Sequence, residues 1–333
     1  MRPVFSLHYA AILVLLSLPQ AETRGAEPLR FVTKDTLAPQ DDKLPDAQAC
    51  LDGLLWQLAP FEVTCEERER PRGRNLVRFP SPVATDDERN DLVALDWYVA
   101  RDAAGEPLTA PAVLVIHESG SDMTVGRMFA YCLHLKGIHA FMIHLPHYGE
   151  RRTKQSDRDR AARLVPMVRQ AVADVRRAYD AIAVLPHVAS QRISIQGTSL
   201  GGFVASTAAS LDGCFNEVFI LLAGGDLHDV IANGQKDSAK IRDRLNAAGY
   251  TGQGLKDLLW QIEPTRLTHR LVPAKTWLYS AKDDQVVPLK NAELLAKSAS
   301  LDPEHHLLFA ANHYTGIIFF PAVLEHIVQR VDP

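Results

Sequence analysis

Short apolar runs alternate with longer amphipathic segments along the chain from residue 92 onward. A short continuous apolar run is typical of a strand buried on both faces of a parallel sheet, whereas apolar residues spaced three and four apart indicate a helix. Strands are expected at 92–99, 112–116, 138–145, 193–196, 217–222, 276–280 and 306–309, and helices at 125–136, 165–182, 199–211, 289–300 and 319–331. This alternation predicts an α/β fold, with a mostly parallel central sheet flanked by helices.

The segment that precedes this alternation has a different character. Residues 27–85 are polar and rich in proline, with one apolar stretch at 51–58. We expect them to form an N-terminal extension that lies on the main body. The main domain is then predicted to span residues 86–333.

The N-terminus has the features of a secretory signal peptide. Arg2 is followed by a compact apolar stretch at 9–18, and small residues such as Ala21 and Ala26 come next. This stretch is shorter than the roughly 20 residues that a membrane-spanning helix needs, and no other segment of the sequence is long and apolar enough to span a membrane. We predict a signal peptide at 1–26 and an exported protein, secreted or periplasmic, with no transmembrane segment in the mature chain. The alternatives are an uncleaved anchor or a wrongly assigned start, and the cleavage site is open.

The composition narrows the classes of function. The chain has 333 residues, 47% of them hydrophobic and 23% charged, and 36 basic against 40 acidic residues give a formal net charge of −4. No basic stripe stands out, so a nucleic-acid partner is not expected. The four cysteines show no C-x-x-C spacing, so a zinc or redox site is not supported. No metal and no cofactor is predicted. Cys50 and Cys65 lie close together in the sequence, and whether they form a disulfide in an exported protein is open.

Polar residues gather directly after the predicted strands. In open parallel sheets, ligands bind beyond the C-terminal ends of the strands, so these positions are the informative ones. They are the segments 117–122, 146–152, 197–201, 282–288 and 312–314. Ser199, Asp284 and His313 follow three separate strands in that order.

These three residue types suit nucleophilic catalysis. A serine hydroxyl is a weak nucleophile near neutral pH and needs a base, and a histidine can take its proton and return it to a leaving group. A carboxylate fixes the imidazole tautomer and stabilises the imidazolium. Glycines two residues before and two residues after Ser199 permit a tight turn between strand and helix. The alternative interpretation is a glycine turn without a catalytic role.

At these motifs the chain resembles the α/β-hydrolase fold superfamily, in particular its serine esterases and lipases. The resemblance covers about residues 90–330 and rests on GTSLG at 197–201, DQVVP at 284–288, NHY at 312–314 and the chain order of serine, acid and histidine. It implies a triad of Ser199, His313 and Asp284 and an acyl-enzyme intermediate. It also implies a helical cap inserted at about 226–268.

Two members of the expected triad have competitors in the sequence. Asp283 adjoins Asp284, but superfamily members commonly carry the acid four residues before the proline that opens the next helix, and Pro288 therefore favours Asp284. His313 lies in the loop after the last strand, where the base is expected. The competing histidines lie around the start of that strand or inside the final helix: His305, His306 and His326.

The resemblance also implies an oxyanion hole with two backbone N–H donors. One donor is expected from Leu200, the residue after the nucleophile, and the other from the loop 117–121. Superfamily members often have glycine after the histidine of this loop, whereas here Glu118 stands in that place. Ser119 is predicted as the second donor, with Glu118 as the alternative.

The segment PHYGERR at 146–152 follows a strand at the same edge of the sheet. Arg151, with Tyr148 beside it, is a candidate for substrate binding, because arginine forms charge-assisted hydrogen bonds with anionic groups. Arg152 is a second candidate. The alternative is a structural role in which the arginine pairs with Glu150 or another nearby acid.

We therefore predict a secreted serine hydrolase that cleaves a small-molecule carboxylic ester. A peptidase, thioesterase or acyltransferase on the same fold is an alternative, as is a non-catalytic binding protein. The sequence makes no prediction of the oligomeric state.

Overall fold

The computed structural model describes residues 27–67, 74–153 and 161–332. Within them, ten strands form one sheet in the order β1-β2-β3-β4-β6-β5-β7-β8-β9-β10. The strands are β1 (Leu29–Lys34), β2 (Pro60–Glu67), β3 (Arg74–Pro80), β4 (Leu92–Tyr98), β5 (Ala110–Ile116), β6 (His139–His144), β7 (Val188–Thr198), β8 (Val218–Leu221), β9 (Thr276–Ala281) and β10 (His306–Phe309). The signal peptide predicted at 1–26 lies outside the described residues.

Six neighbouring strands, β6-β5-β7-β8-β9-β10, make the parallel part of the sheet. β5, β6 and β9 are buried at every position, which is the environment that their apolar sequences require. Because the six strands run in one direction, their C-terminal ends meet at one edge, and the polar segments that follow them come together there. The predicted α/β fold with a mostly parallel sheet is confirmed.

The first four strands pair antiparallel with one another, and β4 pairs antiparallel with β6. Three of them, β1 to β3, come from the segment 27–85, which we expected to lie on the main body as an extension. The segment instead lengthens the sheet. Its polar composition conceals a strand pattern, because in β2 the residues Phe61, Val63 and Cys65 are buried while the residues between them are more exposed.

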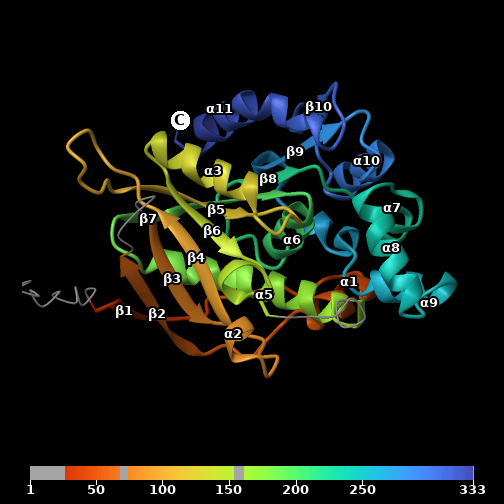
Figure 1. Cartoon of the computed structure of the whole chain (residues 1–333), viewed down its shortest axis with the longest axis horizontal. Helices are drawn as coiled ribbons and strands as arrows, with labels where there is room; N and C mark the ends of the chain where they lie inside the picture. Colours follow the sequence, from red (N-terminus) through yellow and green to blue (C-terminus); the bar gives the residue numbers. More distant parts are fainter. Residues whose placement is uncertain (1–26, 68–73, 154–160, 333) are drawn as a thin grey trace, which may run out of the picture.

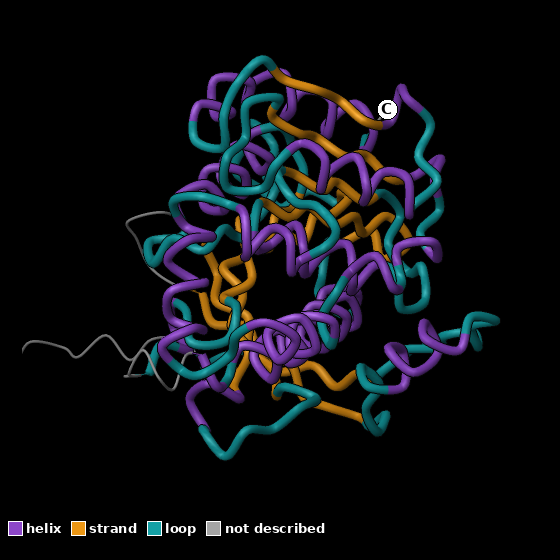
Figure 2. The backbone as a smooth tube through the Cα atoms, turned by 90° about the vertical axis from the view of Figure 1, so that its right-hand side faces the viewer, coloured by secondary structure: helices purple, strands orange, loops and turns teal. Residues whose placement is uncertain are grey.

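Helices cover both faces of the sheet, and Figures 1 and 2 show the strands running between them. One face packs against α1 (Pro45–Asp52), α5 (Leu164–Ala183), α6 (Leu200–Ala209) and α10 (Leu289–Ser298). The other face packs against α3 (Thr124–Leu135) and α11 (Phe320–Val331). The single turn α2 (Glu88–Asp91) precedes β4. Among the helices of the described residues, none combines the length and the apolar character needed to cross a membrane.

Three further helices lie between β8 and β9 in the sequence, within residues 226–268. They are α7 (Leu227–Asn233), α8 (Asp237–Ala247) and α9 (Gly252–Trp260), and Figure 1 shows them together on the right-hand side of the molecule. They share a hydrophobic cluster of their own, in which Leu245, Leu255 and Leu259 are buried together with Val165 of α5. We call α7, α8 and α9 the cap helices.

The two cysteines with an open disulfide assignment are free thiols. Cys50 of α1 and Cys65 of β2 are both buried. Burial raises the pKa of Cys65 to about 11, so little of this thiol is deprotonated at neutral pH. Both cysteines therefore act as small apolar core residues.

A buried ion pair fastens the N-terminal segment to α5. Arg177 donates from Nε to Asp35 Oδ1 (2.8 Å) and from Nη2 to Asp35 Oδ2 (2.5 Å), and Asp35 Oδ2 also accepts the Ala59 N–H (3.0 Å). The Asp35 side chain is 0% exposed. A buried pair of this kind is tolerated because both charges are hydrogen-bonded, and removing one partner leaves the other charge without compensation.

Asp35→Ala is expected to lower the free energy of unfolding by about 3–5 kcal/mol, because Arg177 stays buried without its partner. Glu62→Ala is the control, since it removes an exposed partner of Arg30 in the same group of strands and should cost less than about 1 kcal/mol. Urea unfolding followed by circular dichroism measures both changes. An equal decrease in the free energy of unfolding in the two variants would contradict a stabilising role of the buried ion pair.

Candidate active site

Ser199 makes the sharp turn between β7 and α6. Its backbone has φ 53° and ψ −116°, a region that residues with a side chain rarely adopt. The Ser199 N–H donates to the Leu221 carbonyl oxygen (2.8 Å), and the Ser199 carbonyl accepts the Gly202 N–H (2.8 Å). These bonds to the neighbouring strand and helix hold the strained residue at the C-terminal edge of the sheet.

Close backbone packing explains the glycines on either side of this serine. A Cβ atom on Gly197 would lie 2.1 Å from the Gly201 carbonyl oxygen, and a Cβ atom on Gly201 would lie 2.2 Å from the Ile116 carbonyl oxygen. The start of α6 thus approaches β5 and β7 at distances that leave no room for side chains. The GTSLG sequence is a requirement of this packing.

His313 links Ser199 to Asp284. Its Nε2 lies 3.1 Å from Ser199 Oγ, and its Nδ1 lies 2.7 Å from Asp284 Oδ2. Asp284 Oδ1 accepts the backbone N–H groups of Val286 (2.8 Å) and Val287 (2.9 Å), and the Asp284 side chain is only 2% exposed. Both carboxylate oxygens are therefore held in place. The Nδ1–H donates to Asp284, which leaves Nε2 free to accept the proton of the serine hydroxyl.

The competing residues lie away from Ser199. Asp283 is exposed, and its backbone N–H donates to the Ala311 carbonyl oxygen (2.9 Å). The other histidines have partners of their own: His305 contacts the Thr276 carbonyl, His306 contacts Ser280 Oγ, and His326 contacts the Tyr279 hydroxyl. The structure brings Asp284 and His313 to the serine and keeps their competitors apart from it.

The loop 117–120 lies beside Ser199, and Glu118 and Ser119 line the same pocket as the serine. The Glu118 carboxylate accepts the N–H groups of Val125 and Gly126 (3.1 Å each), so it binds the N-terminus of α3, where a negative charge is stabilised. The Glu118 side chain thus ties the loop to α3.

The predicted oxyanion donors lie close to the serine. Leu200 is the first residue of α6, where backbone N–H groups have no partner within the helix. Ser119 lines the pocket. The assignment of their N–H groups to an oxyanion stays a prediction.

His117 and Tyr148 support this loop. His117 is fully buried, its Nδ1 lies 2.6 Å from the Glu118 carbonyl oxygen, and its Nε2 accepts the Leu145 N–H (3.2 Å). Burial lowers the pKa of His117 to about 3, so the ring is neutral at physiological pH. The Tyr148 ring packs on His117 (centroids 4.7 Å apart), and its hydroxyl donates to the Ser119 carbonyl oxygen (3.1 Å). Tyr148, predicted to bind substrate, contacts the loop and does not line the pocket.

Arg151 has a structural position. Its side chain is fully buried, Nη1 lies 2.8 Å from Asp174 Oδ2, and Nε donates to the Asn90 carbonyl oxygen (2.6 Å). The prediction that Arg151 binds substrate is wrong, because the guanidinium is enclosed by residues of α2, β6 and α5. The alternative of pairing with a nearby acid is right, with Asp174 of α5 as the partner. Arg152, the second candidate, is exposed.

A second buried contact shapes the turn that carries Tyr148. The Glu150 N–H donates to His144 Nδ1 (3.0 Å), and His144 Nε2 lies 3.2 Å from Oδ2 of the buried Asp96. Gly149 has φ 49°, and a Cβ atom there would lie 2.5 Å from His144 Nδ1. The segment 146–152 therefore serves to place Tyr148 against the loop 117–120.

A cavity of about 430 Å³ opens at Ser199. Its polar residues are Glu118, Ser119, Thr198, Ser199, Asp237, His313 and Tyr314, and its apolar side chains are Val125, Phe129, Leu221, Leu222, Phe309, Ile317, Phe320 and Val323, together with the ring of Tyr279. Sequence reasoning did not identify this apolar lining, because its members come from α3, β8, β9, β10, α11 and the turn η6 (Thr315–Phe319).

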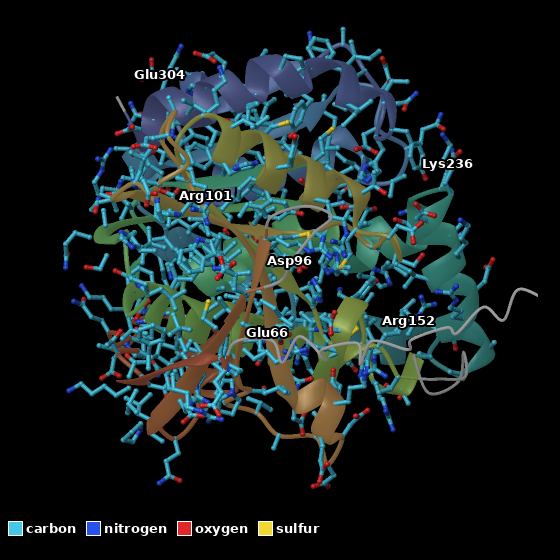
Figure 3. All side chains as sticks on the ribbon, turned by 60° about the vertical axis from the view of Figure 1, so that its left-hand side comes forward. Glu66, Asp96, Arg101, Arg152, Lys236 and Glu304 are labelled. Atoms are coloured by element: carbon cyan, nitrogen blue, oxygen red, sulfur yellow. The ribbon has the colours of Figure 1, made fainter. Side chains whose placement is uncertain are left out.

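One of the cap helices contributes to the pocket. Asp237 begins α8, and its Oδ2 accepts the Tyr314 hydroxyl (2.9 Å). Lys236 Nζ lies 4.7 Å from the centroid of the Tyr314 ring, and Figure 3 shows Lys236 at the edge of the cap helices. The loop that carries His313 is thereby fixed against α8. Within the described residues, no group of three or more His, Cys, Asp or Glu side chains is placed to hold a metal ion.

No protein-family model matches the sequence, and no curated protein matches it. Solved structures match in architecture. Acetyl xylan esterase 1 from Thermoanaerobacterium sp. JW/SL YS485 has a TM-score of 0.61 at 12% identity, over 88% of this chain and 96% of that one. The chain has the α/β-hydrolase fold.

Two further solved structures with this fold show how widely it extends over the chain. Acetyl xylan esterase from Paenibacillus sp. R4 has a TM-score of 0.57 at 13% identity, over 88% of this chain and 96% of that one. A puromycin-hydrolyzing peptidase from Mycobacterium tuberculosis has a TM-score of 0.55 at 15% identity, over 81% of this chain and 46% of that one. At these sequence identities the likeness shows the fold alone. In the α/β-hydrolase fold, the polar residues of the site follow the strands, as Ser199, Asp284 and His313 do here.

Gly201→Ala is expected to destabilise the hydrolase fold by at least about 2 kcal/mol, because the added methyl group meets the backbone of Ile116. Gly254→Ala in α9 is the matched control, since a Cβ atom there has no neighbour within 4 Å and alanine favours a helix. Thermal unfolding compares the two variants with the wild type. A Gly201→Ala variant with the same melting temperature as the control would show that the close approach of α6 to β5 is not required for stability.

Proposed function

We propose that this protein is a serine hydrolase that cleaves carboxylic esters through an acyl-enzyme. The observation that supports this best is the hydrogen-bonded chain from Ser199 through His313 to Asp284. Ser199 and His313 line a largely apolar pocket. A serine at a strained turn, a base within hydrogen-bond reach and an acid that orients the base are the parts that nucleophilic acyl transfer requires.

The proposed reaction has two steps. Ser199 Oγ attacks the ester carbonyl carbon while His313 Nε2 takes the hydroxyl proton, and Asp284 stabilises the imidazolium. The negative charge on the carbonyl oxygen is stabilised by the backbone N–H groups of Leu200 and Ser119. His313 then protonates the departing alcohol. A water molecule, activated by the same histidine, attacks the acyl-enzyme and releases the acid.

The solved structures of similar fold support hydrolysis as the reaction class, since they are esterases and a peptidase. Two of those described above act on esters, which favours an ester over an amide here. The sequence identities of 12% and 13% are too low to propose acetylated xylan as the substrate of this protein. A small-molecule ester fits a pocket of about 430 Å³.

Export remains part of the proposal, and it rests on the sequence of residues 1–26. Cleavage of this segment is expected to leave a mature protein that begins between about Glu22 and Glu27. N-terminal sequencing of the protein from its native host tests this. Recovery of the chain with Met1 from the cytosol would contradict export.

Ser199→Ala is expected to lower kcat/KM on p-nitrophenyl butyrate by at least about 10³-fold, because the covalent route is lost. Asp284→Asn should lower it by at least about 10²-fold, since the amide favours the wrong imidazole tautomer. Asp283→Asn is the matched control, an identical change at the adjacent exposed residue, and should stay within about twofold of the wild type. Circular dichroism verifies that each variant folds.

Two outcomes of this comparison would count against the proposal. If the Ser199→Ala variant kept the wild-type rate, Ser199 would not be the nucleophile. Greater damage from Asp283→Asn than from Asp284→Asn would show that the acid is wrongly assigned. An ester product formed when an alcohol is added would instead indicate acyl transfer.

A further inference from the structure

We propose that the pocket at Ser199 binds the acyl group of the substrate as an unbranched apolar chain of about eight carbons. This size allows each methylene group about the 30 Å³ that a water molecule occupies in the liquid. The substrate would then be a medium-chain carboxylic ester. This inference rests on the proposed function and adds to it the class of substrate.

The pocket reaches into the interior of the protein. Phe129, Tyr279 and Val323 line it, although these residues are only 2%, 1% and 4% exposed. All three belong to the hydrophobic core between the sheet and the pair of helices α3 and α11. The lining of the cavity therefore extends from Ser199 to residues of the layer between helices and sheet, and a buried apolar lining suits a chain better than a broad polymer surface.

Aromatic rings form the inner walls. Phe129 and Phe320 pack edge to face with centroids 4.8 Å apart, and Tyr279 stacks with Phe309 at 6.2 Å. The only polar atom of this group, the Tyr279 hydroxyl, contacts His326 Nδ1 (2.8 Å). A sugar or a charged acyl group would lose hydrogen bonds to water at these walls, whereas an alkyl chain gains by leaving water.

Two polar residues of the pocket, Tyr314 and Asp237, lie on the His313 side. Tyr314 follows His313 in the chain, the two rings lie 5.6 Å apart, and the Tyr314 hydroxyl contacts Asp237. The departing alcohol takes its proton from His313, so the alcohol must occupy this polar part. The acyl chain then occupies the apolar part of the pocket, which α3, β9 and α11 enclose.

The size of the cavity sets the length of the chain. Eight methylene-sized groups fill roughly half of the 430 Å³, which leaves the remainder for the reacting ester and the alcohol. Each methylene group buried in the pocket should raise kcat/KM by about fourfold until the inner end is reached.

The test is a series of p-nitrophenyl esters from acetate to palmitate with the full-length protein, and a matched series of alkyl acetates from methyl to octyl. We expect kcat/KM to rise at least about 100-fold from acetate to octanoate and to fall beyond decanoate. The alkyl acetates should show less than about tenfold variation over the same range of lengths.

Two variants locate the chain within the pocket. Val323→Phe adds bulk on the pocket side of α11 and should lower the octanoate-to-acetate ratio of kcat/KM by at least about tenfold. Val328→Phe, on the same helix but outside the pocket, is the matched control and should leave the ratio unchanged. Val125→Phe, at a half-buried position of the lining, replaces Val323→Phe if that variant does not fold.

The outcomes separate this inference from the proposed function. Hydrolysis that depends on Ser199 but is fastest with acetate would overturn the acyl-chain assignment and leave the hydrolase proposal intact. A steep rise in the alkyl acetate series instead would show that the alcohol occupies the apolar pocket. No hydrolysis in either series by the folded wild type would overturn both.

Discussion

The close backbone contact between α6 and the strands β5 and β7 is the constraint on which the site depends. Gly197 and Gly201 allow this contact, since a Cβ atom on either would meet a carbonyl oxygen at 2.1 to 2.2 Å. The contact forces Ser199 into its strained conformation and places the first N–H groups of α6 beside it. Asp284 and His313 follow parallel strands of the same sheet, so they lie at the same edge as Ser199.

Buried polar contacts hold the loops around this edge. Glu118 ties its loop to the N-terminus of α3, and Tyr148 donates to the carbonyl group of the next residue in that loop. Arg151 and His144 in turn fix the segment that carries Tyr148. Because charged and polar groups are costly to bury unless they are hydrogen-bonded, each of these contacts specifies one arrangement of its loop.

The sequence predicted the sheet and the meeting of Ser199, Asp284 and His313 because both follow from local patterns. Apolar runs identify parallel strands, and residues directly after such strands share one edge. The sequence left Arg151 open between substrate binding and pairing with an acid, and it did not predict the contact of Tyr148 with the loop 117–120. The partners Asp174 and Ser119 are distant in the chain, and only the folded packing brings them to Arg151 and Tyr148. The strands β1 to β3 were missed because polar residues alternate with the buried ones in β2 and because β1 is largely exposed. The pocket was missed because six elements contribute to it.

The most direct test of the account is the reaction of the folded protein with a fluorophosphonate, followed by mass spectrometry of the digested chain. The account predicts one phosphonyl adduct per chain, located on Ser199, because the Ser199 hydroxyl has a base at 3.1 Å that an acid orients. Prior unfolding in urea should abolish the adduct. A folded protein that forms no adduct, or carries it on another residue, would contradict the assignment of Ser199 as a nucleophile.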